Sequence, residues 1–310
     1  MSSILSKAKL GTQPGGRPPA AVEITPEGVL AAAIPAPGQP AVYAYQALPA
    51  GSLLPGIGEP NLRASEAVVA AIKATLGQVS PRTKAVTLVV PDSVVRVFVL
   101  DFDSLPAKPL EAYPVLRFRL RKMVPFDAEH AGLSYQVLTQ NRNECKVLVG
   151  VLPGMILAEY EDAVRAAGYE PGAVLPSSLA TLEAIDLMEA VLIANLSPVA
   201  LTTTIVNGQD LLLYRTLDLP EETSQRLDEV RRGVAVAAAY YEDKLGGRPT
   251  RIHFAGASGT PESGAEEFSR WIDDPELSVV DLAPRPESGA VTSLGTASIA
   301  AVAGALAGVR

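Results

Sequence analysis

The sequence predicts an α/β protein with two lobes around a cleft and a smaller β-α-β-β-α subdomain inserted into the first lobe. Three observations support this fold class. The chain has 310 residues, of which 48% are hydrophobic, enough to form two cores. A strand hairpin, a helix and a further strand follow one another in each half, which suggests two related lobes. After Asp92 the pattern changes, and a second set of strands and helices begins.

The first lobe is predicted at residues 21–92 and 170–190. Its elements are a strand hairpin, a third strand, a helix for which Ser65 is a suitable N-cap and Gly77 a suitable end, and a buried strand before Asp92. Residues 1–20 are rich in Gly and Pro, so we expect a flexible tail there.

The inserted subdomain is predicted at residues 93–169. A strand is followed by a helix that begins near Pro109, an antiparallel pair of strands and an amphipathic helix at 155–168. Pro114 lies inside the first of these helices, so we expect a kink or a delayed helix start there.

The second lobe is predicted at residues 191–310. Residues 194–215 are typical of a strand, a tight turn at Asn207-Gly208 and a second strand. A long helix at 223–247, a strand entering a Gly-rich turn at 251–259 and a helix of small residues at 296–308 follow.

Composition excludes several classes of function. The net charge of −8 argues against nucleic-acid binding, and one cysteine and two histidines argue against a thiolate or histidine metal site. His130 and His253 have no catalytic partner nearby in the sequence, and Asp101 with Asp103 is typical of a solvated turn. No segment approaches the ~20 apolar residues that span a bilayer, so we expect a cytoplasmic protein.

The order of these parts, with the segments "VVPDSVVRVFVLDFDSLP", "RKMVPFDAEHAGLSYQVL" and "VRRGVAVAAAYYEDKLGG", resembles the type IV pilus assembly protein PilM family. The resemblance covers most of residues 21–310, with the "PDS" turn and the "VPFD" segment as its most family-like points. It implies an actin-like (ribonuclease H-like) ATPase fold, related to the cell-division protein FtsA.

In active members of this superfamily, the hairpin turn of each lobe carries an Asp that acts through a metal and glycines that let backbone N–H groups approach phosphates. The resemblance places Glu23, Thr25 and Pro26 at these positions in the first lobe, where the turn ends at Gly28. In the second lobe it places Asn195, Ser197 and Pro198 there, and Thr202 follows in the same site. Proline has no N–H to donate, and Asn195 carries no charge. Both phosphate sites therefore look degenerate.

The segment "FAGASG" resembles the adenosine-contacting turn of the family through Gly256, Ser258 and Gly259, although an ordinary strand end is an equal interpretation. From these departures we expect no catalytic residue, no metal and no cofactor, with at best weak ATP or ADP binding. A nucleotide-dependent ATPase or filament former of the same superfamily is the alternative.

The resemblance also implies a partner, the cytoplasmic N-terminal segment of a PilN-like membrane protein, which would hold this protein at the inner membrane. We expect an apolar groove between the first lobe and the insert, built from Val95, Val97, Val99, Leu116, Leu120, Pro125 and Phe126. The other interpretation is that these side chains pack the insert against its own lobe.

Two further alternatives remain. The cytoplasmic domain of a GspL-like type II secretion protein has a similar fold but continues into a transmembrane helix; none follows before Arg310, so we expect this alternative only if the sequence was cut. The basic run of Arg117, Arg119, Arg121 and Lys122 could meet an anionic membrane or an acidic partner, although a solvated helix face is the ordinary interpretation.

Overall fold

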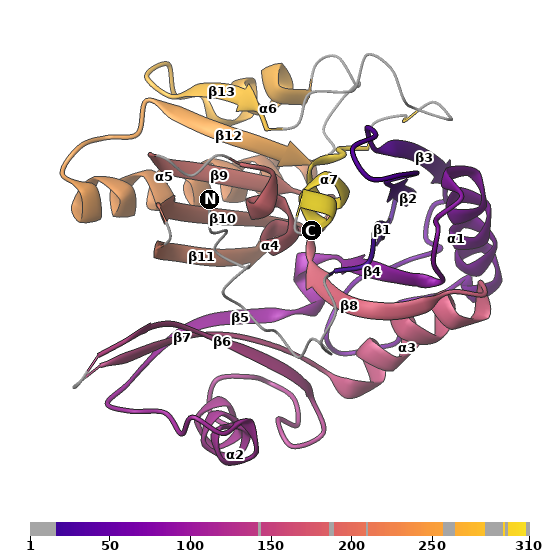
Figure 1. Ribbon diagram of the computed structural model, residues 1–310. Coiled ribbons are helices and arrows are strands. Elements are labelled where there is room, and N and C mark those ends of the chain that lie inside the picture. Colours follow the sequence, from indigo (N-terminus) through magenta and orange to yellow (C-terminus); the bar gives the residue numbers. More distant parts are fainter. Residues whose placement is uncertain are drawn as a thin grey trace.

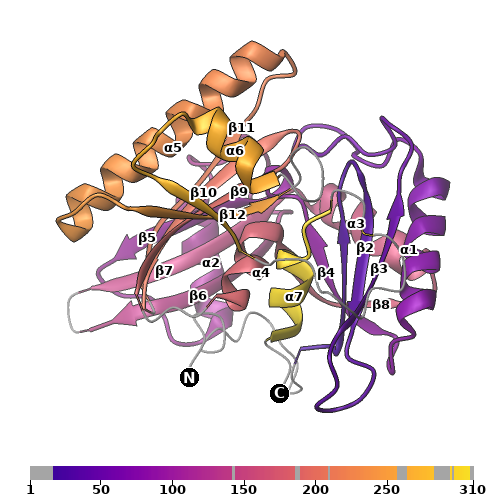
Figure 2. The same cartoon turned by 90° about the horizontal axis from the view of Figure 1, so that it is seen from above.

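The computed structural model describes residues 17–141, 144–185, 189–208, 210–256, 264–282, 294 and 297–307. Within them the chain forms two five-stranded mixed sheets and a three-stranded antiparallel sheet. Figure 2 shows the two larger sheets side by side, with helices α4 and α7 between them.

The first sheet has the order β3-β2-β1-β4-β8. Strands β1 to β3 form an antiparallel meander, and β4 and β8 run parallel to β1. Every residue of β1 and β2 is buried, because helices cover both faces of this sheet. The strands are β1 (Ala20–Ile24), β2 (Gly28–Ala33), β3 (Val42–Ala47), β4 (Ala85–Val90) and β8 (Glu170–Pro176).

The second sheet repeats this plan in the order β11-β10-β9-β12-β13. Again three strands form an antiparallel meander, and two further strands run parallel to the first of them. The two lobes therefore share one topology, as the sequence predicts. The strands are β9 (Ala190–Leu196), β10 (Ala200–Asn207), β11 (Asp210–Asp218), β12 (Arg251–Gly256) and β13 (Ser278–Asp281).

Helices cover the outer face of each sheet and fill the space between the sheets. In the first lobe, α1 and α3 pack on one face, while α7 and the short α4 lie on the other (Figure 1). In the second lobe, α5 and α6 cover the outer face. The helices are α1 (Ser65–Val79), α3 (Gly154–Ala166), α4 (Ser177–Thr181), α5 (Thr223–Leu245), α6 (Gly264–Ile272) and α7 (Ala300–Ala307), with single 3-10 turns η1 (Asp92–Val94) and η2 (Leu182–Ala184).

The insert is a three-stranded sheet in the order β5-β7-β6, covered on one face by a single helix. Its opposite face packs on the second lobe, because Val97, Val99 and Leu148 share a cluster with Ile193 and Val206. The insert therefore contacts both lobes. Its elements are β5 (Arg96–Phe102), α2 (Pro109–Leu120), β6 (Gly132–Gln140) and β7 (Cys145–Leu152).

Packing places two helices differently from the sequence prediction. Helix α3, expected in the insert, contributes Ile156, Tyr160 and Val164 to the core of the first lobe. Helix α7, expected in the second lobe, packs Val302 and Leu306 against the first sheet. In both cases the apolar face was recognisable in the sequence, but the sheet it covers is decided by how the chain returns in space.

Several boundaries also differ. The predicted strand at 194–206 is two strands, β9 and β10, separated by a turn at Ser197. Helix α1 begins at Ser65 itself and continues past Gly77 to Val79, where Ser80 ends it with a left-handed backbone (φ 48°). Helix α2 begins at Pro109 and runs through Pro114, so its start is not delayed. The turn after Asn207 is confirmed, with Gly208 at φ 59°.

Residues 17–20, the last four of the predicted flexible tail, are part of the described structure. Residues 1–16 lie outside the described part of the chain. Within the predicted tail, β1 already begins at Ala20, and the guanidinium of Arg17 lies 3.7 Å from the carboxylate of Glu183. The body of the protein therefore includes residues 17–20.

Candidate functional site

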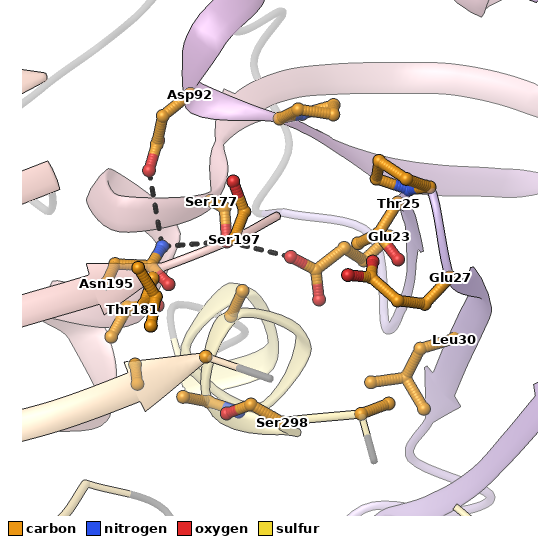
Figure 3. A pocket seen from close by; sticks show the side chains of 18 of the residues that line it. Glu23, Thr25, Glu27, Leu30, Asp92, Ser177, Thr181, Asn195, Ser197 and Ser298 are labelled. Carbon is orange, nitrogen blue, oxygen red and sulfur yellow. Dashed lines mark hydrogen bonds between the residues drawn. The ribbon is translucent and has the colours of Figure 1, made fainter. Parts of the chain in front are cut away.

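The two lobes meet at a cleft lined by the hairpin turns of both sheets, by residues that follow β4 and β8, by the end of β12 and by α7 with the residues just before it (Figure 3). It encloses about 60 Å³. Pockets for small-molecule ligands typically enclose roughly 300–1,000 Å³. The enclosed volume of this cleft is therefore below the range that is typical of ligand pockets.

The hairpin turns of the two lobes are closed by similar internal hydrogen bonds. In the first, the Thr25 and Gly28 N–H groups each donate to the other residue's carbonyl, at 2.9 and 3.2 Å. In the second, Ser197 N–H donates to the Ala200 carbonyl at 2.8 Å, and Ala200 N–H donates to the Ser197 hydroxyl at 3.0 Å. Donors that a phosphate would need are thus engaged within each turn.

A proline occupies the same place in both turns, Pro26 in one and Pro198 in the other. Proline lacks the N–H that a phosphate oxygen could accept. Together with the engaged donors, this leaves fewer backbone N–H groups in each turn that could bind a phosphate.

The two described glycines of the predicted nucleotide site are explained by packing. A side chain at Gly28 would collide with the Tyr45 ring and the Gln46 carbonyl, and one at Gly256 would collide with the Leu196 backbone. Gly256 also has a φ of 142°, which favours glycine. These glycines therefore permit close approach of neighbouring strands and need no ligand to account for them.

Asn195, at the end of β9, connects the two lobes. Its side-chain amide donates to Asp92 at 3.3 Å and to the hydroxyls of Ser177 and Ser178 at 3.1 Å each (Figure 3). Ser177 in turn donates to the Glu23 carboxylate at 2.7 Å. The neutral amide of Asn195 thus lies between the carboxylates of Asp92 and Glu23, where the negative charge of a third carboxylate would be repelled.

Asp92 is a buried acid of the cleft whose carboxylate accepts several hydrogen bonds. It follows β4 and accepts hydrogen bonds from the Ser178 N–H at 2.9 Å, from the Ser178 hydroxyl and from the Tyr214 hydroxyl at 3.2 Å. Burial raises the pKa of Asp92, and the hydrogen bonds from Ser178, Thr202 and Tyr214 oppose that rise. The carboxylate therefore joins the first lobe to α4 and to the second lobe.

Two further acids face the same cleft. Burial raises the pKa of Glu23 to about 7; the Ser177 hydrogen bond opposes the rise, and the nearby charges of Asp92 and Glu27 add to it. Burial likewise raises the pKa of Glu27, against hydrogen bonds from its own backbone and from Thr25. The carboxylates do not converge, since no group of three His, Cys, Asp or Glu residues in the described part of the chain could hold a metal ion.

The cleft brings together five of the predicted nucleotide-site residues: Glu23, Thr25, Asn195, Ser197 and Gly256. Gly28 lies behind the first turn, and Thr202 is buried beneath the cleft, 3.0 Å from the Thr216 hydroxyl. Ser258 and Gly259 lie outside the described residues.

Sequence reasoning missed other polar residues at the cleft. Glu27, Asp92 and Ser177 line it, and Ser178 and Tyr214 donate hydrogen bonds to Asp92. A signal for some of them was present. Asp92 and Ser177 follow the parallel strands β4 and β8, and the carboxyl ends of parallel strands are where α/β proteins place their sites.

A second concave feature lies between the first lobe and the insert. This groove encloses about 270 Å³ and runs between residues 171–176 of β8, residues of β6 and β7, and the start of α3. Its apolar lining includes Val95, Leu133 and Leu152, while Arg17 and Ser134 add polar groups. Both β8 and β6 are outermost strands of their sheets.

The groove predicted from the sequence is not the one observed. Leu116 and Leu120 are fully buried in the core of the insert, and Val97 and Val99 pack towards the second lobe. Phe126 packs against the insert core, Pro125 is exposed, and only Val95 of the seven lines the groove. The groove lies at the β6 edge of the insert because α2 and the second lobe already cover the faces that these residues occupy.

Comparisons with solved structures identify the architecture. A chain of the PilM-PilN type IV pilus biogenesis complex matches with a TM-score of 0.73 and 18% identity, over 94% of this chain and 98% of its own length. A Bacteroides thetaiotaomicron protein of unknown function with an actin-like ATPase fold matches at TM-score 0.51 and 12% identity, over 94% and 95%. The fold is actin-like. The predicted fold class, an actin-like fold with two lobes, is confirmed.

The actin-like fold is shared with a secretion protein. The cytoplasmic domain of EpsL, an inner membrane component of the type II secretion system of Vibrio cholerae, matches at TM-score 0.50 and 14% identity, over 87% of this chain and 89% of its own. No protein-family model and no curated protein sequence matches the chain. In the described residues, no helix is both long enough and apolar enough to cross a membrane.

Proposed function

We propose that this protein is a non-catalytic, actin-like scaffold on the cytoplasmic side of a type IV pilus inner-membrane platform. Its partner is the N-terminal cytoplasmic segment of a PilN-like membrane protein, which would hold it at the membrane. Neither a metal nor a cofactor takes part. Support comes from the likeness to a chain of the PilM-PilN complex and from the two concave sites.

The observation that carries the proposal is the groove between the first lobe and the insert. An outermost strand has backbone groups that no neighbouring strand of its sheet pairs, and an extended peptide can add to such an edge. Here β8 and β6 bring two such edges to one groove, and apolar side chains line it. This surface suits an extended segment with apolar anchors.

The absence of catalysis is proposed from the cleft. Both hairpin turns use N–H groups of their own for internal hydrogen bonds, and both contain proline. Asn195 is a neutral amide at the position where an acid is expected, and it donates a hydrogen bond to Asp92 of the other lobe. Charge-assisted hydrogen bonds are worth about 1.5–3 kcal/mol each, so the loss of two would weaken nucleotide binding by roughly 10²-fold or more.

The groove can be tested by filling it. Gly150 lines the groove, and a Cβ added there would meet no atom within 4 Å, so Gly150→Phe fills the groove without straining the backbone. Gly77 on α1 is equally open and lies outside the groove, which makes Gly77→Phe the matched control. The tagged protein is used to capture partners from native membranes. Recovery of a PilN-like protein by the control and its loss with Gly150→Phe would support the proposal, whereas equal recovery would contradict it.

Nucleotide binding is tested separately by calorimetric titration with Mg-ATP and by measuring ATP turnover. We expect no turnover and at best weak binding that does not depend on magnesium. Micromolar affinity that disappears when magnesium is chelated would mean an intact site, and would favour an ATPase or filament former instead.

A second candidate is the EpsL-like component of a type II secretion platform, because the EpsL cytoplasmic domain has the same fold. The capture experiment separates the two functions. Recovery of type II secretion components in place of a PilN-like protein would favour this candidate.

A further inference from the structure

Arg17, the first of the described residues, lies on the wall of the groove between the first lobe and the insert. Its side chain is only 13% exposed. The next residue, Pro18, packs against β8 at Gly172, where it occupies the space that a side chain at that glycine would need. Arg17 is therefore held beside β8, near the start of the stretch 171–176 that lines the groove.

The guanidinium of Arg17 has hydrogen-bonding capacity that the described chain does not use. Among the described residues, Nη1 is buried and has no hydrogen-bond partner. Nη2 lies 3.7 Å from the carboxylate of Glu183, which makes an ion pair but is too long for a hydrogen bond. Buried polar groups in native proteins nearly always have a partner, so this donor points to an acceptor that comes from outside the described chain.

The charges around Arg17 favour a neutral acceptor. Glu183, whose side chain is 4% exposed, already compensates the charge of the guanidinium. Burial lowers the pKa of Arg17, and the charge of Glu183 opposes this fall. Glu161 also lines the groove, and it pairs with Arg165 at 2.8 Å. A carboxylate from a partner would be repelled by Glu183 and Glu161, whereas a carbonyl oxygen brings no charge.

The backbone of β8 is short of donors beside Arg17. An extended peptide that pairs with the edge of a sheet needs N–H groups for its own carbonyl oxygens. Within the groove-lining stretch 171–176, Pro171 and Pro176 have no N–H to donate. A peptide carbonyl that passes the start of this stretch therefore needs a donor from a side chain, and Arg17 lies there.

We propose that Arg17 is a recognition residue of the groove and that its guanidinium donates hydrogen bonds to a main-chain carbonyl of the peptide bound there. This contact rests on the proposed function, because it requires the groove to hold an extended peptide. Arg17 would recognise the backbone, which every peptide has, and the apolar lining would select side chains. The partner segment should therefore carry no acidic side chain where it passes Arg17.

The test measures the affinity of a labelled synthetic peptide by fluorescence anisotropy. The peptide copies the N-terminal cytoplasmic segment of the membrane protein that the Gly77→Phe control recovers. We expect Arg17→Gln to bind it about 10- to 100-fold more weakly than the wild type does, because a hydrogen bond from a charged group is lost. Glu183→Gln removes the ion pair but keeps the guanidinium, so it is the matched control and should bind like the wild type.

Folding of the variants is checked by thermal unfolding. Arg17→Gln leaves the buried carboxylate of Glu183 without this counter-charge, which can destabilise the protein. The double variant Arg17→Gln/Glu183→Gln has two neutral amides in place of the pair, and it should show the same loss of peptide affinity as Arg17→Gln.

Ester substitutions in the peptide identify the carbonyl that Arg17 contacts. An ester carbonyl is a weaker hydrogen-bond acceptor than an amide carbonyl, so each amide of the peptide is replaced in turn. We expect one position at which the ester weakens binding to the wild type but has little further effect on binding to Arg17→Gln. Such non-additivity is the mark of two groups in direct contact.

Three outcomes would overturn this role for Arg17 alone. They are normal peptide binding by Arg17→Gln, equal losses of affinity in Arg17→Gln and Glu183→Gln, and an ester scan with the same profile in wild type and Arg17→Gln. A peptide that the wild type does not bind, or that Gly150→Phe binds as tightly as the wild type, would instead contradict the proposed function and this role with it.

Discussion

Glu23 is a buried acid whose carboxyl group joins two elements at the cleft. It lies on a fully buried strand and accepts a hydrogen bond from Ser177, so its carboxyl group contributes to the contact between β1 and α4. No cation compensates its charge among the described contacts, and its pKa of about 7 reflects that burial.

The pH dependence of stability should reveal this carboxyl group. Its folded-state pKa of about 7 lies above the ordinary value of 4.5, so the folded state holds the proton more tightly than the unfolded state. Stability should therefore fall as pH rises from about 4.5 to about 7 and change no further above that range, with a total cost of about 3 kcal/mol from this group.

The variant Glu23→Gln removes the titration and keeps a hydrogen-bond acceptor for Ser177. We expect it to be more stable than the wild type at pH 8, with a smaller difference at pH 5, as measured by urea unfolding at each pH. A difference between variant and wild type that does not change with pH would contradict this account.

At the scale of the element, α2 allows its two apolar faces to be compared directly. Leu116 is fully buried and Phe118 is 71% exposed, although they are only two positions apart in the sequence. Leu116→Ala should destabilise the protein by about 2–5 kcal/mol, because it leaves a cavity in the insert core. Thermal unfolding measures this loss.

On the opposite face, Phe118→Ala should change the stability by no more than about 0.5 kcal/mol. Equal losses from Leu116→Ala and Phe118→Ala would mean that the outward face of α2 packs against something in the folded protein.

At the scale of the whole molecule, the cleft is closed by the protein's own hydrogen bonds. Asp92, Ser178, Asn195 and Tyr214 link the first lobe, α4 and the second lobe in one buried network. In such a network the removal of one donor leaves a buried acceptor with one hydrogen bond fewer and no water to replace it.

Asn195→Asp tests this link between the lobes. The variant loses the donor to Asp92 and adds a negative charge beside it, so we expect a lower melting temperature at pH 8 and a larger radius of gyration by small-angle scattering. Because the acids of the cleft have raised pKa values, the effect should be smaller at pH 5. Asn195→Ala, which loses the donor without adding charge, is the control and should be less destabilised at pH 8.

The sequence by itself determined the local elements and the plan of two similar lobes with an insert. Hydrophobic periodicity and turn residues depend on neighbours along the chain, so the first-lobe hairpin, the turn after Asn207, the long helix α5 and the insert strands could all be predicted. The changed residues in both turns, Pro26 and Pro198 among them, were equally visible because each lies within a short motif.

Only the tertiary structure decided which sheet each apolar helix covers and which polar groups meet. Helices α3 and α7 both pack on the first lobe, and the groove between the first lobe and the insert lies at the β6 edge, away from Leu116 and Leu120. Asp92, Ser178 and Tyr214 are far apart in the sequence and meet where strands of both lobes end. The physical reason is that burial and hydrogen bonding between distant segments depend on how the chain returns in space, and a local pattern carries no record of that path.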